Sequence, residues 1–291
     1  MNIKITLLLV LALFSVSTSP VIAKALTGVN AISISFWRMF FASLILWIYS
    51  CFKPQGKIKI DVNRNKIIYA GILLGIHFAL FFTAVKSTHI ANATFLGTLA
   101  PFFTLLIELY ILKRNYSKII LIGLVFTLIG SIVILSNNFD ISTMHTKGNL
   151  YAILCSICLA IAFMIAEKVR ANETTIVYTR LLYLSASITL LAILFITSND
   201  IINHLFKHNF HEYLGLLFLG LVPTILGHNS IYYAVKYVSP TIVAAFPLGE
   251  PIIATILAYF IFNEQITLNV VIGGSITLIG LVLISQYKKN K

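Results

Sequence analysis

The stretch TLIGSIVILS at residues 127–136 recurs as TLIGLVLISQ at residues 277–286. The correspondence extends without a gap over residues 84–136 and 234–286, at a constant offset of 150. These 53 aligned positions hold 12 identities, where roughly four are expected by chance in a chain this rich in isoleucine and leucine. The chain is therefore built from two related halves.

The composition indicates a membrane protein. Hydrophobic residues make up 59% of the 291 residues and charged residues only 10%, and the mean hydropathy is +0.95. Soluble domains average about 45–50% apolar and about 25% charged residues. A membrane-spanning helix needs about 20 predominantly apolar residues, so the chain can hold ten such helices only if its connections are short.

We predict ten membrane-spanning helices, and none of the connections is long enough to form a soluble domain. The predicted spans cover residues 5–25, 32–52, 67–85, 94–112, 119–135, 149–166, 176–197, 213–235, 241–262 and 268–285. Five spans fall in each half, and we place the halves at residues 1–143 and 144–291.

The net charge of +12 does not indicate nucleic-acid binding, because the basic residues gather on one side of the predicted membrane. Of the 21 lysines and arginines, fifteen lie in segments on the side of the N-terminus and two, Arg38 and Arg180, lie inside spans. The four on the opposite side are Lys24, Lys86, Lys147 and Lys207. This asymmetry follows the positive-inside rule and predicts that both termini are cytoplasmic.

Because each half contains an odd number of spans, the second half must enter the bilayer from the opposite side to the first. Two inverted copies of one packing unit are related by an axis in the membrane plane, and the cavity between them can open to either side with similar energies. The expected fold is an all-α membrane protein with ten transmembrane helices in two inverted five-helix repeats around a central cavity. Before the gapless region the offset drifts to about 142, which aligns Arg38 with Arg180.

Several motifs recur at defined places in this topology. A proline, Pro101, lies in the fourth span, Glu250-Pro251 lies in the ninth, Asn263-Glu264 closes the ninth, and the last span carries glycines. This pattern resembles the drug/metabolite transporter superfamily, specifically its EamA-type ten-helix transporters. The resemblance implies a secondary transporter of small metabolites in the bacterial inner membrane, with export as the commoner direction. One departure is that the fourth span ends in Lys113-Arg114-Asn115, where the second half has the acid Glu264.

Glu250 is the deepest acidic residue in the predicted spans. An ionised group at the centre of a bilayer costs about 2.5–3.5 kcal/mol on insertion scales, so such residues commonly serve a function. We expect the Glu250 carboxylate to face the cavity, where it could bind a proton or a substrate amine. The alternative is a neutral glutamate that hydrogen-bonds a neighbouring helix near Pro251.

Further cavity candidates are polar or aromatic residues within the spans. They are His77, His228, Asn229, Tyr232, Trp37 and Arg38. The two histidines are within one residue of equivalence under the repeat, and such a pair could relay protons or bind a carboxylate. The alternative for each histidine is an interhelical hydrogen bond. For Arg38, and for Glu108 near the end of the fourth span, the favoured interpretation is a side chain that snorkels to the membrane interface. The alternative for Arg38 is contact with an anionic substrate group.

Prolines and glycines predict how the spans bend and pack. Pro101 and Pro251 each remove a backbone donor from mid-span, so they predict helix breaks or hinges whose freed backbone lines a cavity. A simple packing kink is the alternative. The glycine pairs at 123 and 130 and at 273 and 280 are spaced seven residues apart, so each pair lies on one helix face and predicts close packing of the fifth and tenth spans.

The leading functional hypothesis is a secondary transporter that exports a small polar metabolite such as an amino acid by alternating access, with or without coupling to protons. The alternative is uptake or exchange of a nucleotide-linked or adenosyl metabolite, and a channel is a third possibility. An enzyme is disfavoured, because Asp61, Asp140 and Asp200 all lie in connections and no HExxH or GxSxG motif occurs. The Cys155-Ser156-Ile157-Cys158 motif lies inside an apolar span without further metal ligands. We therefore expect no catalytic residues, metal or cofactor. The expected partners are a small-molecule substrate, the lipid bilayer and, with coupling, protons; the chain would be a monomer or a homodimer.

Overall fold

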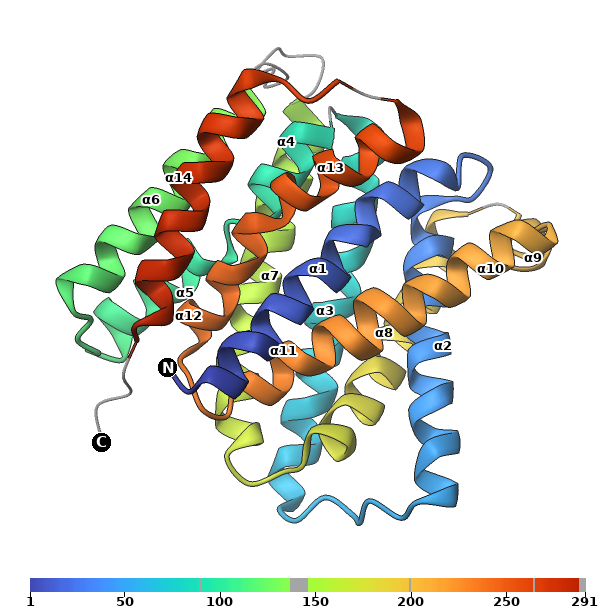
Figure 1. Ribbon diagram of the computed structural model, residues 1–291. Helices are drawn as coiled ribbons and strands as arrows, with labels where there is room; N and C mark the ends of the chain where they lie inside the picture. Colours follow the sequence, from blue (N-terminus) through green and yellow to red (C-terminus); the bar gives the residue numbers. More distant parts are fainter. Residues whose placement is uncertain (89, 137–145, 199, 264, 288–291) are drawn as a thin grey trace.

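The computed structural model describes residues 1–88, 90–136, 146–198, 200–263 and 265–287, and these form the helical structure in Figure 1. The first half contains α1 (Ile3–Ala25), α2 (Ala31–Phe52), α3 (Asp61–Ser87), α4 (Ile90–Gly97), α5 (Ala100–Leu106), η1 (Ile107–Ile111) and α6 (Lys118–Leu135). The second half contains α7 (Thr146–Arg170), α8 (Thr175–Thr197), α9 (Ile201–Phe206), α10 (Phe210–Leu219), η4 (Gly220–His228), α11 (Asn229–Ala234), α12 (Pro240–Ala245), η5 (Phe246–Gly249), α13 (Glu250–Phe262) and α14 (Leu268–Ser285).

Within the described residues, nine helical stretches are long and apolar enough to cross a membrane, and Lys118–Ile134 is a shorter apolar helix. Together they account for the ten predicted spans. The third span is longer than predicted, because its helix begins at Asp61 and includes the polar turn that precedes the apolar residues. The protein is an all-helical membrane protein with two inverted five-helix repeats around a central cavity.

In the part of the chain that the structure describes, three spans are interrupted rather than continuous. The fourth is α4, α5 and the π-helix η1; the eighth is α10, the π-helix η4 and α11; the ninth is α12, the 3₁₀-helix η5 and α13. The interruptions in the fourth and ninth spans occupy corresponding places in the two halves, since the offset of 150 aligns η5 with residues 96–99, where α4 ends. Mid-span interruptions of this kind expose backbone polar groups, which a membrane protein tolerates where they line a cavity.

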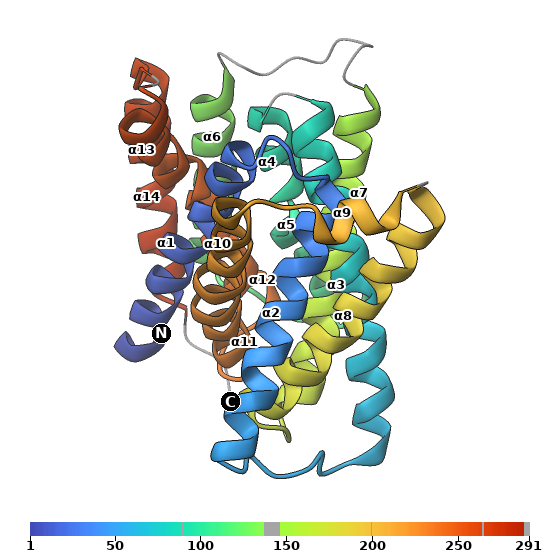
Figure 2. The same cartoon turned by 90° about the vertical axis from the view of Figure 1, so that its right-hand side faces the viewer.

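The helix contacts repeat under the inversion. Helix α3 packs along α7. In the other half, η4, which corresponds to part of α3, packs along α1, which corresponds to α7. The pairs α2 with α8 and α6 with α14 each join a helix to its own counterpart, and α5 with α12 joins the fourth span to its counterpart, the ninth, as expected near an axis that relates the two halves. Figures 1 and 2 show α6 and α14 side by side at one edge of the molecule.

The predicted packing of the fifth and tenth spans is confirmed at the glycines. A Cβ atom added to Gly130 would lie 2.6 Å from the carbonyl oxygen of Gly273, and one added to Gly280 would lie 2.6 Å from that of Gly123. These backbones approach too closely for any larger residue, as in other small-residue helix interfaces in membranes.

The first and last spans meet at one end of the molecule. The amino group of Met1 donates a hydrogen bond of 3.1 Å to the carbonyl oxygen of Ser285, at the end of α14. Figure 1 shows the N-terminus at this end. An even number of spans places the two ends on the same side of the membrane, and this contact is consistent with that topology.

Candidate functional site

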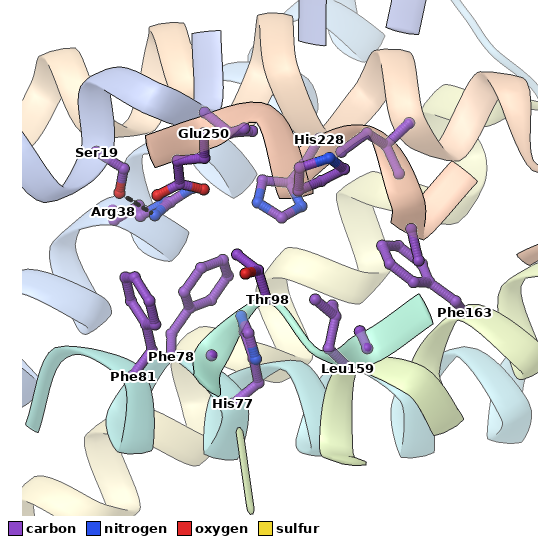
Figure 3. A pocket seen from close by; sticks show the side chains of 16 residues that line it. Ser19, Arg38, His77, Phe78, Phe81, Thr98, Leu159, Phe163, His228 and Glu250 are labelled. Carbon is purple, nitrogen blue, oxygen red and sulfur yellow. Dashed lines mark hydrogen bonds between the residues drawn. The ribbon is translucent and has the colours of Figure 1, made fainter. Parts of the chain in front are cut away.

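A cavity of about 60 Å³ lies between the two halves. Its polar wall carries Ser19, Arg38, His228 and Glu250, from α1, α2, η4 and α13. The opposite wall, shown in Figure 3, carries His77 and an apolar group made of Phe78, Phe81, Leu159 and Phe163. Four of the seven predicted cavity residues, Arg38, His77, His228 and Glu250, therefore line one space.

Arg38 is buried in the cavity wall, and the prediction that it snorkels to the interface is wrong. Its Nε donates to Thr224 Oγ1 at 2.8 Å, and its Nη1 donates to Ser19 Oγ at 2.8 Å. Its Cζ lies 4.2 Å from the ring centre of Phe78, which is a cation–π distance. Because Thr224, Ser19 and Phe78 hold the guanidinium, it is fixed in the cavity wall and does not extend to the membrane interface.

The partner Thr224 is itself positioned by a proline. Pro223 lies inside the π-helix η4 and has no N–H, so the carbonyl of Leu219, four residues earlier, loses its helical donor. Thr224 Oγ1 donates to that carbonyl at 2.8 Å and accepts from Arg38 Nε. Sequence reasoning missed this arrangement, although a proline in the eighth span was visible in the sequence.

Glu250 occupies the first turn of α13, immediately after η5. The break in the ninth span thus places a carboxylate at a helix N-terminus, where the free N–H groups and the helix dipole favour negative charge. The side chain is buried, interacts electrostatically with Arg38 and faces the cavity (Figure 3). One wall of the cavity therefore presents a guanidinium group and a carboxyl group to the same space.

The two histidines lie in different environments within the cavity. His77 Nδ1 lies 2.9 Å from the carbonyl oxygen of Cys155. A carbonyl only accepts hydrogen bonds, so Nδ1 carries the proton and a neutral His77 leaves Nε2 as an acceptor. His228 Nδ1 is buried and has no partner among the described residues, while its ring contacts Phe78 edge to face at 5.4 Å. His228 is therefore available to a ligand or a water molecule.

The predicted hinge prolines lie beside the breaks rather than within them. Pro101 lies in the first turn of α5, after a break at Thr98 and Leu99, and Pro251 lies in the first turn of α13. The ninth span has a further proline, Pro247, inside η5 and on the cavity wall. Sequence reasoning missed Pro247, whose missing N–H contributes to the break before Glu250. A hinge role for Pro101 and Pro251 remains a prediction.

Three predicted cavity residues do not line this cavity. Trp37 Nε1 donates to the carbonyl oxygen of Leu205 at 3.0 Å, on the other side of α2. Asn229 Oδ1 accepts from the Tyr183 hydroxyl at 2.8 Å. Tyr232 is buried, and its ring packs 5.2 Å from that of Tyr178. Asn229 and Tyr232 thus support the cavity wall from behind, and their substrate contact remains a prediction.

The sequence as a whole matches a known family. A model of the EamA-like transporter family matches residues 2–136 and again residues 146–286. The protein belongs to the EamA-like transporter family. This EamA-like protein is thereby a member of the drug/metabolite transporter superfamily and a multi-pass membrane transporter of small molecules, as the resemblance implied.

Relatives of this EamA-like protein include transporters with and without a stated substrate. A Rickettsia conorii protein named S-adenosylmethionine uptake transporter is 28% identical over 97% of this chain and 92% of its own. A Rickettsia prowazekii protein of the same name is 27% identical over the same shares of each chain. An Archaeoglobus fulgidus protein named as an uncharacterized transporter is 24% identical over 88% of this chain and 87% of its own.

A solved crystal structure shares the fold of the EamA-like chain. It aligns with a TM-score of 0.80 over 97% of this chain and 96% of its own, at 15% sequence identity. Similarity at this level of identity supports the architecture and carries no information on the substrate.

Proposed function

We propose that this protein carries a small metabolite with an amino-acid head group across the bacterial plasma membrane by alternating access. Free amino acids are the leading substrate class, and export is the proposed direction. The observation that carries the proposal is that Arg38 and Glu250 line one cavity between the inverted repeats. A zwitterion presents a carboxylate and an ammonium group, and the cavity offers a fixed partner for each.

The size of the cavity supports a carrier that changes conformation. In the described conformation its volume of about 60 Å³ holds only a few water molecules. A metabolite therefore requires the two halves to move apart, and the inverted repeat supplies two equivalent ways to do so. A protein of this kind would show saturable transport and counterflow, whereas a channel would show flux linear in substrate concentration.

Proton coupling is assigned to Glu250 as part of this proposal. A carboxylate that can bind either a proton or a substrate ammonium group makes the two compete for one site, which links substrate release to protonation. His77 and His228 line the same cavity and offer further proton-binding nitrogens.

A second candidate substrate follows from the relatives named S-adenosylmethionine uptake transporters. That compound carries an amino-acid head group, a positive sulfonium and an adenine ring. Arg38 and Glu250 would bind the head group as they would for a free amino acid. The aromatic wall of Phe78, Phe81 and Phe163 would stack against the adenine. Uptake would then be the direction.

We place both termini in the cytoplasm on the basis of the charge asymmetry, fifteen basic residues against four. The end of the molecule that carries Met1, Arg114 and Ser285 would then face the cytoplasm.

The proposal is tested with purified protein in liposomes loaded with a metabolite mixture, with flux read by mass spectrometry. A pH gradient is imposed and then collapsed. Saturable flux of one or more amino acids supports the leading version. Flux of S-adenosylmethionine without flux of free amino acids replaces it with the second candidate, and absence of flux for both classes refutes recognition of the head group. Protein-free liposomes and the variant Arg38→Ala serve as controls.

A further inference from the structure

Glu108 is buried at one end of the fourth span, and the prediction that it snorkels to the interface is wrong. Its side chain has no exposed surface, and its carboxylate accepts hydrogen bonds from Arg114, Tyr116 and Thr241. The bond from the Tyr116 hydroxyl is 2.5 Å long, and the bond from the Thr241 backbone N–H is 3.2 Å long. Lys113 adopts a left-handed conformation with φ 52°, which turns the chain back and brings Arg114 onto Glu108.

These contacts join the two halves of the molecule. Arg114 donates from Nη1 and Nη2 to the two carboxylate oxygens of Glu167 at 3.0 and 2.9 Å, and Glu167 belongs to α7 in the second half. The Tyr116 hydroxyl oxygen also lies 2.7 Å from Ser239 Oγ, next to α12, and accepts from it because the Tyr116 proton is donated to Glu108. The Arg114 side chain is 37% exposed and that of Glu167 is 13% exposed, whereas Glu108 is fully buried. Glu108, Arg114 and Glu167 therefore form a bridge of ion pairs that runs from solvent to the interior.

The bridge closes a column of contacts that begins at the central cavity. Ala100 and Ala244 line the cavity on α5 and α12. One turn further toward the bridge, the hydroxyl oxygens Thr241 Oγ1 and Thr104 Oγ1 lie 3.1 Å apart, at hydrogen-bond distance. Glu108 lies one more turn along and contacts Thr241. A route from the cavity to this end requires α5 and α12 to separate, and this separation breaks the bonds to Glu108.

The energetics suit a contact that opens and closes. Removing the partners of a buried carboxylate leaves an uncompensated charge and is strongly unfavourable, so Glu108 holds the closed arrangement. The outer pair of Arg114 and Glu167 is partly hydrated, so water can replace it at modest cost. Burial and the charge of Glu108 raise the pKa of the Tyr116 hydroxyl well above its usual value, so Tyr116 remains a donor at all physiological pH values.

We propose that Arg114, Glu108 and Glu167 form an ion-pair gate that holds this end of the cavity closed, and that substrate passage to this side requires the gate to break. The inference rests on the proposed alternating access. The ninth span continues from Thr241 through Pro247 to Glu250, so opening of the gate also moves the Glu250 side chain that is proposed to bind substrate.

The test measures access to the cavity without any substrate, so its failure is distinct from failure of the substrate assignment. Cys51, Cys155 and Cys158 are replaced by serine or alanine, and Ala244→Cys serves as the reporter. A charged, membrane-impermeant thiol reagent is added to membrane vesicles from one side or the other, and the labelling rate is followed by mass spectrometry. We expect Glu167→Gln and Arg114→Ala to raise the labelling rate from the Arg114 side by about fivefold or more. Glu167→Asp keeps the charge and should stay within about twofold of the parent rate.

Arg64→Ala is the matched control, because it removes an exposed basic residue of α3 that has no part in the bridge. We expect this control to leave the labelling rate unchanged. Equal labelling rates in the parent, Glu167→Gln and Arg114→Ala proteins would overturn the proposal. So would an equal increase from both sides of the vesicles, which would indicate general loosening rather than a gate. A variant that loses its monodisperse elution is replaced by Arg114→Lys, which should lie between the parent and Arg114→Ala.

Discussion

Arg38 provides the first test at the scale of single residues. We expect Arg38→Lys to weaken substrate binding about tenfold or more. Lysine lacks the planar guanidinium group, so it cannot contact Ser19, Thr224 and a substrate carboxylate at the same time. Such hydrogen bonds to charged groups are worth about 1.5–3 kcal/mol each. Concentration dependence of transport, fitted for KM and maximal rate, measures the effect.

Arg180→Lys is the matched control, since the repeat aligns Arg180 with Arg38. Arg180 donates to the carbonyl oxygen of Gly56 at 2.7 Å and lies over the Trp47 ring, away from the cavity. Its replacement should leave the KM within about twofold of the parent value. Equal effects of the two substitutions would remove Arg38 from the substrate site.

Glu250 is tested through the pH dependence of transport. Glutamine keeps the shape of the side chain but cannot exchange a proton with the cavity. We expect Glu250→Gln to transport substrate without response to an imposed pH gradient, whereas the parent protein responds. Flux under opposite gradients in liposomes measures this. Glu212→Gln, which alters a helix cap at the start of α10, should keep the response. A pH response in Glu250→Gln equal to that of the parent would refute the coupling role.

At the scale of elements, the pair α6 and α14 is expected to be a rigid scaffold. A Cβ at Gly273 would lie 2.5 Å from the carbonyl oxygen of Gly130, which is backbone and cannot rotate away. We therefore expect Gly273→Ala to destabilise the protein by about 1–3 kcal/mol through overpacking. The melting temperature in detergent should fall by several degrees.

The adjacent Gly274 supplies the control for this prediction. A Cβ there would lie 3.6 Å from the Ile252 side chain, an ordinary contact, so Gly274→Ala should leave the melting temperature nearly unchanged. Equal melting temperatures for the two variants would mean that the interface is looser than the distances indicate.

The interrupted spans show where sequence reasoning reached its limit. Pro101 and Pro251 mark the fourth and ninth spans, but the chain bends one turn before each of them, at Thr98–Leu99 and at η5. A proline disfavours helical geometry in the residue before it and removes a bond to the preceding turn, so its effect is felt upstream. The span could be predicted from the sequence, whereas the position of the break depended on how both helices pack around the cavity.

At the scale of the whole molecule, the architecture followed from two features of the sequence. Hydropathy predicted the ten spans, and the 150-residue repeat with five spans per copy required the inversion. The spans could be predicted because hydropathy depends only on residues close together in the sequence, and the inversion could be predicted because it follows from the repeat. Glu264, where the halves differ in charge, and the junction at residues 137–145 lie outside the described residues.

The candidate site was harder to predict, because its geometry depends on contacts between distant segments. Arg38 could be placed inside a span, but its partners Ser19 and Thr224 lie on two other helices. Many serines and threonines occur in the spans, so nothing in the sequence singles these two out. Glu108 was misassigned for the same reason, since Tyr116 and Thr241 approach it only in the folded chain. Trp37 looked like a stacking residue, yet it faces α9 rather than the cavity.

Counterflow shows whether the central cavity binds an amino-acid head group with Arg38 and Glu250 and opens alternately to each side of the membrane. Liposomes containing the protein are loaded with a high concentration of unlabelled substrate and diluted into a trace of the labelled compound, with the pH gradient collapsed. We expect label to accumulate transiently inside the liposomes above its external concentration, and we expect this accumulation to disappear in Arg38→Ala protein. Label that only equilibrates, at a rate linear in its concentration, would refute alternating access and indicate a channel.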